Sequence, residues 1–227
     1  GSEMCIRDSP GIIFAMIPAT TRSMSGLCAT PSGRRQIPAT ETERPFGGQT
    51  FSKPYTMKLI LSDKPIPEIR VDGRQTHYFD LSTMKISPCV GCYGCWTRTP
   101  GKCVIRDDAT RVYPHIAQSD RVLYITRVRY GCYDSVMKRM LERAIPVQQA
   151  FIRIHNGETH HVQRAVVPKQ ATIIAYGDLT DEEKDIFSQL VSRNSQNMNF
   201  ASFRIIFTTE AQLGESVKKI LDEWEQH

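Results

Sequence analysis

The sequence has few of the features that mark membrane proteins or nucleic-acid-binding proteins. A membrane-spanning helix needs about 18 to 20 consecutive apolar residues, and the longest early apolar run, residues 11–17, stops at Pro18. The net charge is only +5, and residues 1–55 contribute +2 of it through six basic and four acidic side chains. We therefore expect neither a membrane nor a nucleic-acid partner.

The sequence also lacks the phosphate-binding turn that usually follows the first strand of an open α/β sheet. The apolar run at residues 57–61 predicts a buried first strand. A Gly-rich or Ser-rich turn and a helix N-terminus would normally come next. Here Pro65 and Pro67 exclude a regular helix. We expect the first crossover helix to be missing.

The first 55 residues are rich in Pro, Thr, Ser, Gly and Arg and show no sustained helical or strand periodicity. Residues 2–9 also resemble the peptide that a translated sequencing adapter produces. We expect residues 1–55 to be a disordered or artefactual N-terminal extension. The folded domain should then span residues 56–227.

In the folded part, short apolar strands alternate with amphipathic helices. Strands are predicted at 57–61, 77–81, 121–126, 171–176 and 202–208. Helices are predicted at 108–118, at 135–145, and after capping boxes at Thr180 with Glu183 and at Thr209 with Gln212. The Asn156-Gly157 pair predicts a hairpin insertion near residues 151–163.

This alternation predicts an α/β fold with an open parallel sheet and helices on both faces. Sheets of this kind bind ligands beyond the carboxyl ends of their strands. The loops at 127–134 and 177–178 should therefore share one edge of the sheet, with the cysteine loop described next beside them.

Four of the seven cysteines lie in one loop, at Cys89, Cys92, Cys95 and Cys103. Glycines at 91 and 94 free the backbone, so the thiolates can point at one centre. A zinc ribbon usually separates two CxxC pairs by a longer connection, so an iron–sulfur cluster is the better metal interpretation. The alternative is a loop of reduced, half-buried thiols. Clustered cysteines in odd number also indicate a reducing, cytoplasmic setting.

Residues 86–108, read with residues 119–143, resemble the flavodoxin-like NAD(P)H-dependent FMN reductases and, among them, the iron–sulfur flavoproteins. The shared features are a PCxGCxxC stretch, a TPGKC turn, the pair Asp107 and Asp108, a strand, an aromatic flavin loop and a closing helix. That helix ends in a Lys-x-x-x-Asp-Arg pattern, which runs here from Lys138 to Arg143 with Glu142 before the arginine. The resemblance covers about residues 57–227.

The resemblance implies a flavodoxin-like fold, FMN as redox cofactor, NAD(P)H as reductant, a small-molecule or protein electron acceptor and a homodimer. It implies a [4Fe–4S] cluster on Cys89, Cys92, Cys95 and Cys103. Tyr130 or Tyr133 would stack on the flavin ring or flank it. The flavin carries the chemistry, so no catalytic side chain is implied. The implied FMN contacts are Arg127, Val128, Arg129, Tyr130, Gly131, Cys132, Tyr133, Gly177 and Asp178.

Two departures from the family pattern leave alternatives open. The phosphate turn has no counterpart at residues 62–75, and Arg127 and Arg129 replace the usual proline and an aromatic residue. These arginines could supply the missing phosphate contacts or bind a different anion. The alternative function is a non-catalytic protein whose cysteine loop binds zinc or acts as a redox or partner-binding element. Glu142 and Arg143 are interpreted as a helix-end ion pair.

Overall fold

The computed structural model describes residues 56–69, 71, 75–155 and 157–226, so the predicted extension at 1–55 lies outside the described residues. Parallel strands form the sheet in the order β2 (Thr76–Asp80), β1 (Lys58–Ser62), β3 (Arg121–Arg129), β7 (Lys169–Tyr176) and β8 (Phe200–Thr208). The short β4 (Cys132–Tyr133) pairs antiparallel with β3. Numbered along the chain, the parallel strands run 2-1-3-4-5, which is the flavodoxin-like order. The predicted fold class is confirmed.

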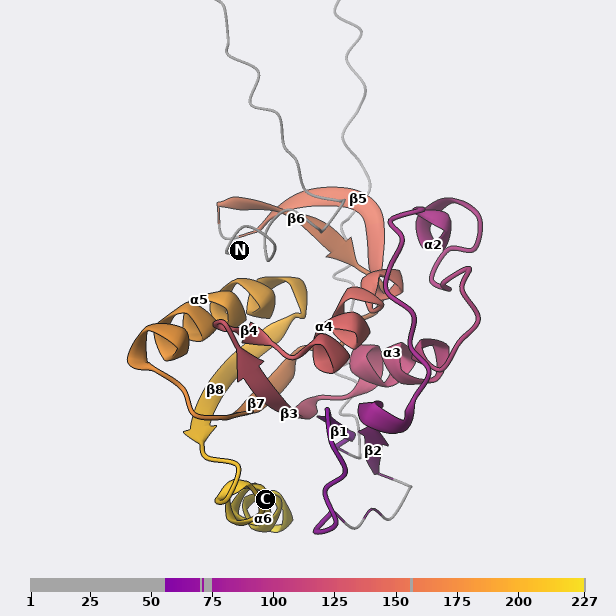
Figure 1. The fold of residues 1–227 in the computed structure, drawn as a ribbon. Helices are drawn as coiled ribbons and strands as arrows, with labels where there is room; N and C mark the ends of the chain where they lie inside the picture. The colour runs from indigo at the N-terminus through magenta and orange to yellow at the C-terminus, as the bar shows by residue number, and fades with distance from the viewer. Residues whose placement is uncertain (1–55, 70, 72–74, 156, 227) are drawn as a thin grey trace, which may run out of the picture.

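The strands alternate their side chains between two apolar cores. Leu59 and Leu61 belong to the core formed with α3 (Ala109–Gln118), α4 (Ser135–Glu142) and α5 (Asp181–Asn197). Ile60 and Leu123 belong to the core formed with α6 (Leu213–Glu225). Figure 1 shows α6 on the opposite side of the sheet from the other three helices. Because both faces are covered, the strands are apolar on both faces.

The connection from β1 to β2 departs from a regular crossover. Its described residues include no helix, as the two prolines predicted. Ile66 is buried in the core on the α6 side, and its N–H donates to Tyr78 Oη at 3.0 Å. The described part of this connection therefore brings no helix N-terminus to the edge of the sheet.

One of the two predicted capping boxes is present, and one helix ends earlier than predicted. Thr180 and Glu183 form the expected capping box at the start of α5. The second capping box is wrong, because Gln212 is itself the residue before α6 and its side chain makes no capping hydrogen bond. The α4 helix also ends earlier than predicted, and a short 3-10 helix, η2 (Ile145–Val147), follows it.

The predicted hairpin is present as β5 (Gln148–His155) and β6 (Glu158–Gln163), which pair antiparallel. In Figure 1 the hairpin lies above α4 and α5. Within the part of the chain that the structure describes, none of the helices has the length and apolar character needed to cross a bilayer.

Candidate functional site

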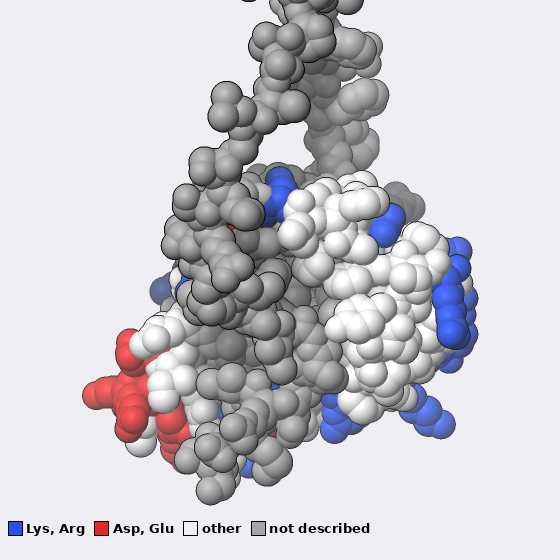
Figure 2. Space-filling model, turned by 90° about the horizontal axis from the view of Figure 1, so that it is seen from above, with Lys and Arg blue, Asp and Glu red and all other residues white. Residues whose placement is uncertain are grey.

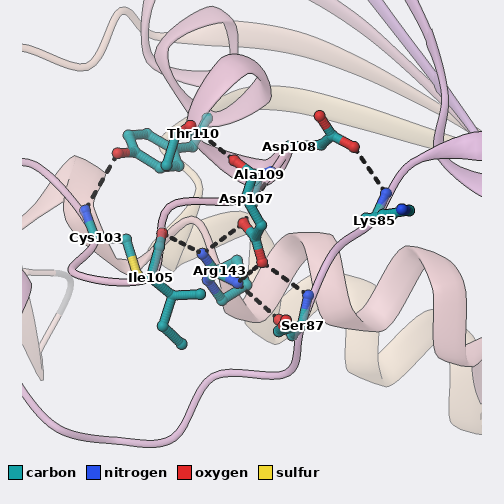
Figure 3. A network of polar contacts seen from close by, with 10 residues as sticks. Lys85, Ser87, Cys103, Ile105, Asp107, Asp108, Ala109, Thr110 and Arg143 are labelled. Atoms are coloured by element: carbon teal, nitrogen blue, oxygen red, sulfur yellow. Dashed lines mark hydrogen bonds and ion pairs between the residues drawn. The ribbon is translucent and has the colours of Figure 1, made fainter.

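A buried arginine anchors the cysteine loop. Arg143 follows the last residue of α4 and its side chain is 1% exposed. Its guanidinium donates to both carboxylate oxygens of Asp107, at 2.7 and 2.9 Å, and to the carbonyls of Ser87 and Ile105, at 2.8 and 3.2 Å (Figure 3). This bidentate geometry is the strong form of the Arg–carboxylate pair. The helix-end pair predicted for Glu142 and Arg143 is wrong, since Glu142 lies near Lys138 instead.

The two aspartates connect the chain entering the cysteine loop to the chain leaving it. Asp107 accepts the N–H of Ser87 at 2.9 Å, and Asp108 accepts the N–H of Lys85 at 2.8 Å (Figure 3). Burial alone would raise the pKa of Asp107, but the hydrogen bonds from Arg143 and Ser87 outweigh it and hold that pKa below its usual value. Asp107 is therefore ionised at neutral pH, and both ends of the loop are fixed.

The four thiols lie close to one another without surrounding a single point. Cys103 is buried, Cys92 is exposed, and Cys89 and Cys95 are half-buried. Burial, followed by the neighbouring thiols of Cys103, Cys89 and Cys92, raises the pKa of Cys95 to about 11. Among the described residues, however, no group of three or more His, Cys, Asp or Glu side chains is arranged to hold a metal ion.

The loop backbone curls as the sequence suggested, by partly different means. Gly91 has φ of 63°, and Tyr93, which is not a glycine, has φ of 54°. Gly94 instead allows a close approach, because a Cβ there would lie 2.5 Å from Val104 Cγ1. Positive φ at Gly91 and tight packing at Gly94 are two separate reasons for a glycine.

The cysteine loop lies against the hairpin. Trp96, in the short helix α2 (Gly94–Thr97), donates from Nε1 to the Gln148 carbonyl at 3.0 Å, and its ring centroid lies 4.6 Å from that of His161. Figure 1 shows α2 beside β5, with α4 between it and β4. Asp134 begins α4 and Arg143 ends it. The anchor of the cysteine loop at Arg143 and the end of the turn at Asp134 therefore lie at opposite ends of α4, a helix about 12 Å long.

The predicted flavin loop is a tight hairpin turn. Tyr130 and Gly131 have φ of 54° and 68°, the signs of a type I′ turn, and Arg129 pairs with Cys132 across it. Tyr130 is 85% exposed, whereas Tyr133 is buried with its ring 5.0 Å from that of Phe187. Of the two tyrosines, Tyr130 can meet a ligand without rearrangement.

The loops at 127–134 and 177–178 come together at the carboxyl edge of the sheet, as expected. A Cβ at Gly177 would lie 3.7 Å from the Val128 carbonyl oxygen, and the Gly177 N–H donates to Thr208 O at 3.2 Å. Asp178 is exposed, and Cys132 is half-buried. Arg129 points to Asp134, with Nε 3.1 Å from its carboxylate.

Arg127 lies on β3 just beyond the last residue pair of β1 with β3, Ser62 with Ile125, and it contacts two acidic side chains. Its N–H donates to Asp63 Oδ2 at 2.6 Å, and its guanidinium forms an ion pair with Glu210. The Tyr176 hydroxyl donates to Asp63 Oδ1 at 2.7 Å, and Lys64 Nζ lies 2.8 Å from Glu210. Sequence reasoning missed Asp63 and Glu210, although a polar residue directly after a buried strand was a visible signal for the first.

The charged groups are unevenly distributed over the surface. Figure 2 shows acidic side chains gathered on the side where α5 begins in Figure 1. The first turn of α5 carries Asp181, Glu182 and Glu183. On the side where α2 lies, the surface is mostly uncharged and bordered by Lys and Arg (Figure 2). This border would favour an anionic group near the cysteine loop.

The strand order and the thiol loop define a flavodoxin-like protein with a cysteine-rich insertion after its second strand. No family model matches the chain. An iron–sulfur flavoprotein of Methanocaldococcus jannaschii is 24% identical over 99 residues, which cover 44% of this chain and 50% of that protein. An iron–sulfur flavoprotein of Archaeoglobus fulgidus is 30% identical over 84 residues, covering 37% of each.

These matches confirm the resemblance to iron–sulfur flavoproteins, and the aligned stretches span half or less of the length of those relatives. Similar solved structures include an FMN-dependent NADH-azoreductase from Bacillus anthracis, with a TM-score of 0.47, 9% identity, and coverage of 74% of this chain and 96% of that one. An NAD(P)H:quinone oxidoreductase from Methanothermobacter marburgensis has a TM-score of 0.43, 11% identity, and coverage of 68% and 87%. The fold assignment rests on the strand order.

Proposed function

We propose that this chain is a redox protein of the iron–sulfur flavoprotein type, with a [4Fe–4S] cluster on Cys89, Cys92, Cys95 and Cys103. Its activity would be that of an FMN-dependent NAD(P)H oxidoreductase or an electron-transfer protein. The observation that carries the proposal is the loop of four neighbouring thiols, both ends of which are hydrogen-bonded to the buried guanidinium of Arg143.

The donor set fits a cluster in its chemistry. Iron–sulfur clusters are held by cysteine thiolates, and compact CxxC runs with one outlying cysteine are typical of them. Cys95 resists ionisation because it is half-buried beside other thiols, and bound cations would reverse that effect. A cubane also spreads its ligand sulfurs farther apart than one metal ion does. The four thiols therefore need not converge on a single point.

Arg143 would have a second role beside a cluster. Its guanidinium lies next to the Cys103 thiol as well as next to Asp107. Hydrogen bonds and positive charge close to the ligand sulfurs are among the features that set the potential of such clusters. We therefore assign Arg143 as a positioning residue that fixes Cys103 and supplies positive charge beside it.

The flavin would lie at the carboxyl edge of the sheet. FMN supplies hydride and electron transfer when bound. The chain offers the exposed Tyr130 ring, the backbone of the turn at Gly131, and the neighbouring Gly177 and Asp178. These residues fit the ring of a flavin, whereas the groups between β1 and β3 do not fit its phosphate. We extend the proposal to a cytoplasmic homodimer with a small-molecule or protein electron acceptor.

Cysteine variants test the cluster. Iron and acid-labile sulfide would be counted in protein purified without oxygen, for the natural chain and for Cys89→Ser, Cys95→Ser and Cys103→Ser. We expect about four irons per chain in the natural protein and a loss of most of them in each variant. Cys132→Ser, outside the loop, is the matched control and should keep its iron.

Zinc in place of iron would contradict the cluster and favour the zinc-binding alternative. Iron that is lost equally from Cys132→Ser would show that the signal does not come from the loop. Protein that holds no metal when reconstituted with iron and sulfide would refute the proposal.

A further inference from the structure

The edge between β1 and β3 is the topological switch point of this sheet. In sheets of order 2-1-3-4-5, an anionic cofactor such as FMN binds in the crevice outside the carboxyl ends of these strands. A phosphate at this place usually receives backbone N–H groups and a helix N-terminus.

The backbone donors at this edge already have acceptors within the protein. The N–H of Asp63 donates to the carbonyl of Ile125 at 3.1 Å, which continues the strand pairing past the end of β1. The N–H of Arg127 and the hydroxyl of Tyr176 both donate to the Asp63 carboxylate, which is 8% exposed. An internal carboxylate thus receives the donors that an anionic ligand would use.

The cationic side chains at this edge are also paired. Lys64, from the end of β1, and Arg127, from β3, converge on the two oxygens of Glu210, from the end of β8. Both cations lie over the ring of Tyr176, at 5.7 and 5.4 Å from its centroid. Hydrogen bonding from Lys64 lowers the pKa of Glu210, so this carboxylate stays ionised at neutral pH.

The geometry points to an internal substitute for the ligand phosphate: Asp63 and Glu210 occupy the phosphate position at the switch point. A flavin bound by this protein is therefore held through its ring and gains no affinity from its phosphate. This inference rests on the proposed function for the flavin, and it extends that function by setting the selectivity between flavins. Arg127 and Arg129 do not replace the missing phosphate turn, because they are paired with Glu210 and Asp134.

The test compares FMN with riboflavin, which has the same ring and lacks the phosphate. In the natural protein, the dissociation constants measured by flavin fluorescence quenching should agree within about threefold. In Glu210→Gln, which releases Lys64 and Arg127, FMN should bind about tenfold or more tightly than in the natural protein. Riboflavin affinity should stay unchanged.

Glu223→Gln is the matched control, because Glu223, on α6, also forms an ion pair with an arginine, Arg204 on β8. It should change neither affinity. A natural protein that prefers FMN to riboflavin by tenfold or more (about 1.4 kcal/mol) would overturn the inference. So would a Glu210→Gln variant with no gain in FMN affinity where flavins bind.

Inorganic phosphate gives a readout that does not depend on flavin binding. At constant ionic strength, replacing chloride by phosphate should raise the melting temperature of Glu210→Gln and leave that of the natural protein and Glu223→Gln unchanged. If neither flavin binds but this difference is seen, the flavin proposal fails and the assignment of the switch point stands. Equal responses in the natural protein and Glu210→Gln would overturn the assignment.

Discussion

Replacing Asp107 by Asn should destabilise the protein far more than the same change at its neighbour, Asp108. The Asp107 carboxylate is the charge partner of a guanidinium that is 1% exposed, and it makes two hydrogen bonds of 2.7 and 2.9 Å to it. Removing one partner of a buried pair costs about 3 to 5 kcal/mol, because the other charge is left uncompensated. Asn keeps one acceptor oxygen, and two carbonyls still accept from Arg143. We therefore expect about 3 kcal/mol.

The assay is reversible urea unfolding at pH 7 under reducing conditions, followed by tryptophan fluorescence. In a thermal melt, the same loss of about 3 kcal/mol would lower the melting temperature by about 6 to 12 °C for a domain of this size. Asp108→Asn is the control, because its carboxylate is a third exposed and lies 3.5 Å from the exposed Arg111. It should cost about 1 kcal/mol or less.

A double variant separates loss of the pair from loss of the loop structure. Arg143→Met combined with Asp107→Asn removes both charges, so it should recover part of the stability that Asp107→Asn loses. Equal costs for Asp107→Asn and Asp108→Asn would refute the reasoning, since the buried charge would then carry no special penalty.

Three further predictions concern the Asp107–Arg143 pair and the turn at Tyr130 and Gly131. Arg143 lowers the pKa of Asp107, so the stability due to the pair is present above the pKa of an unfolded Asp, about 3.9, and is lost as the pH falls through the lower pKa of the folded protein. The difference in unfolding free energy between the natural protein and Asp107→Asn should therefore shrink below about pH 4. A difference that stays constant with pH would contradict the assignment. Gly131→Ala should lower the free energy of unfolding, measured in urea, by about 1 to 3 kcal/mol, because the φ of Gly131 is 68° and a Cβ there would lie 2.5 Å from Ile186. An unchanged urea midpoint would show that the turn relaxes freely. Tyr130→Ala should change stability by less than about 0.5 kcal/mol and weaken riboflavin and FMN by about three- to tenfold in fluorescence titrations; unchanged affinities would place the ring elsewhere.

The sequence predicted those features of the fold that local signals determine. The Asn156-Gly157 pair predicted the hairpin, and Pro65 and Pro67 correctly excluded a helix from the described part of the first crossover. Boundaries were less accurate where pairing extends a strand, as in β3, which continues to Arg129 because the hairpin with β4 adds partners beyond the predicted end.

The anchoring of the cysteine loop could not be read in the same way. Glu142 precedes Arg143 directly, and this adjacency suggested an ion pair, but consecutive residues on a helix do not face each other. The actual partner, Asp107, lies 36 residues earlier and meets Arg143 only through the packing of α3 against α4. Similarly, Arg127 and Glu210 are 83 residues apart and meet only because β3 and β8 end at the same edge.

The most direct test of the central claim, a cluster on the cysteine loop beside a flavin-binding edge, is the visible absorption spectrum of the natural chain purified without oxygen, with iron and zinc counted in the same sample. We expect a brown protein with broad iron–sulfur absorption that bleaches on reduction, iron in place of zinc, and flavin bands after addition of FMN or riboflavin. A colourless protein that takes up neither iron and sulfide nor flavin would contradict it.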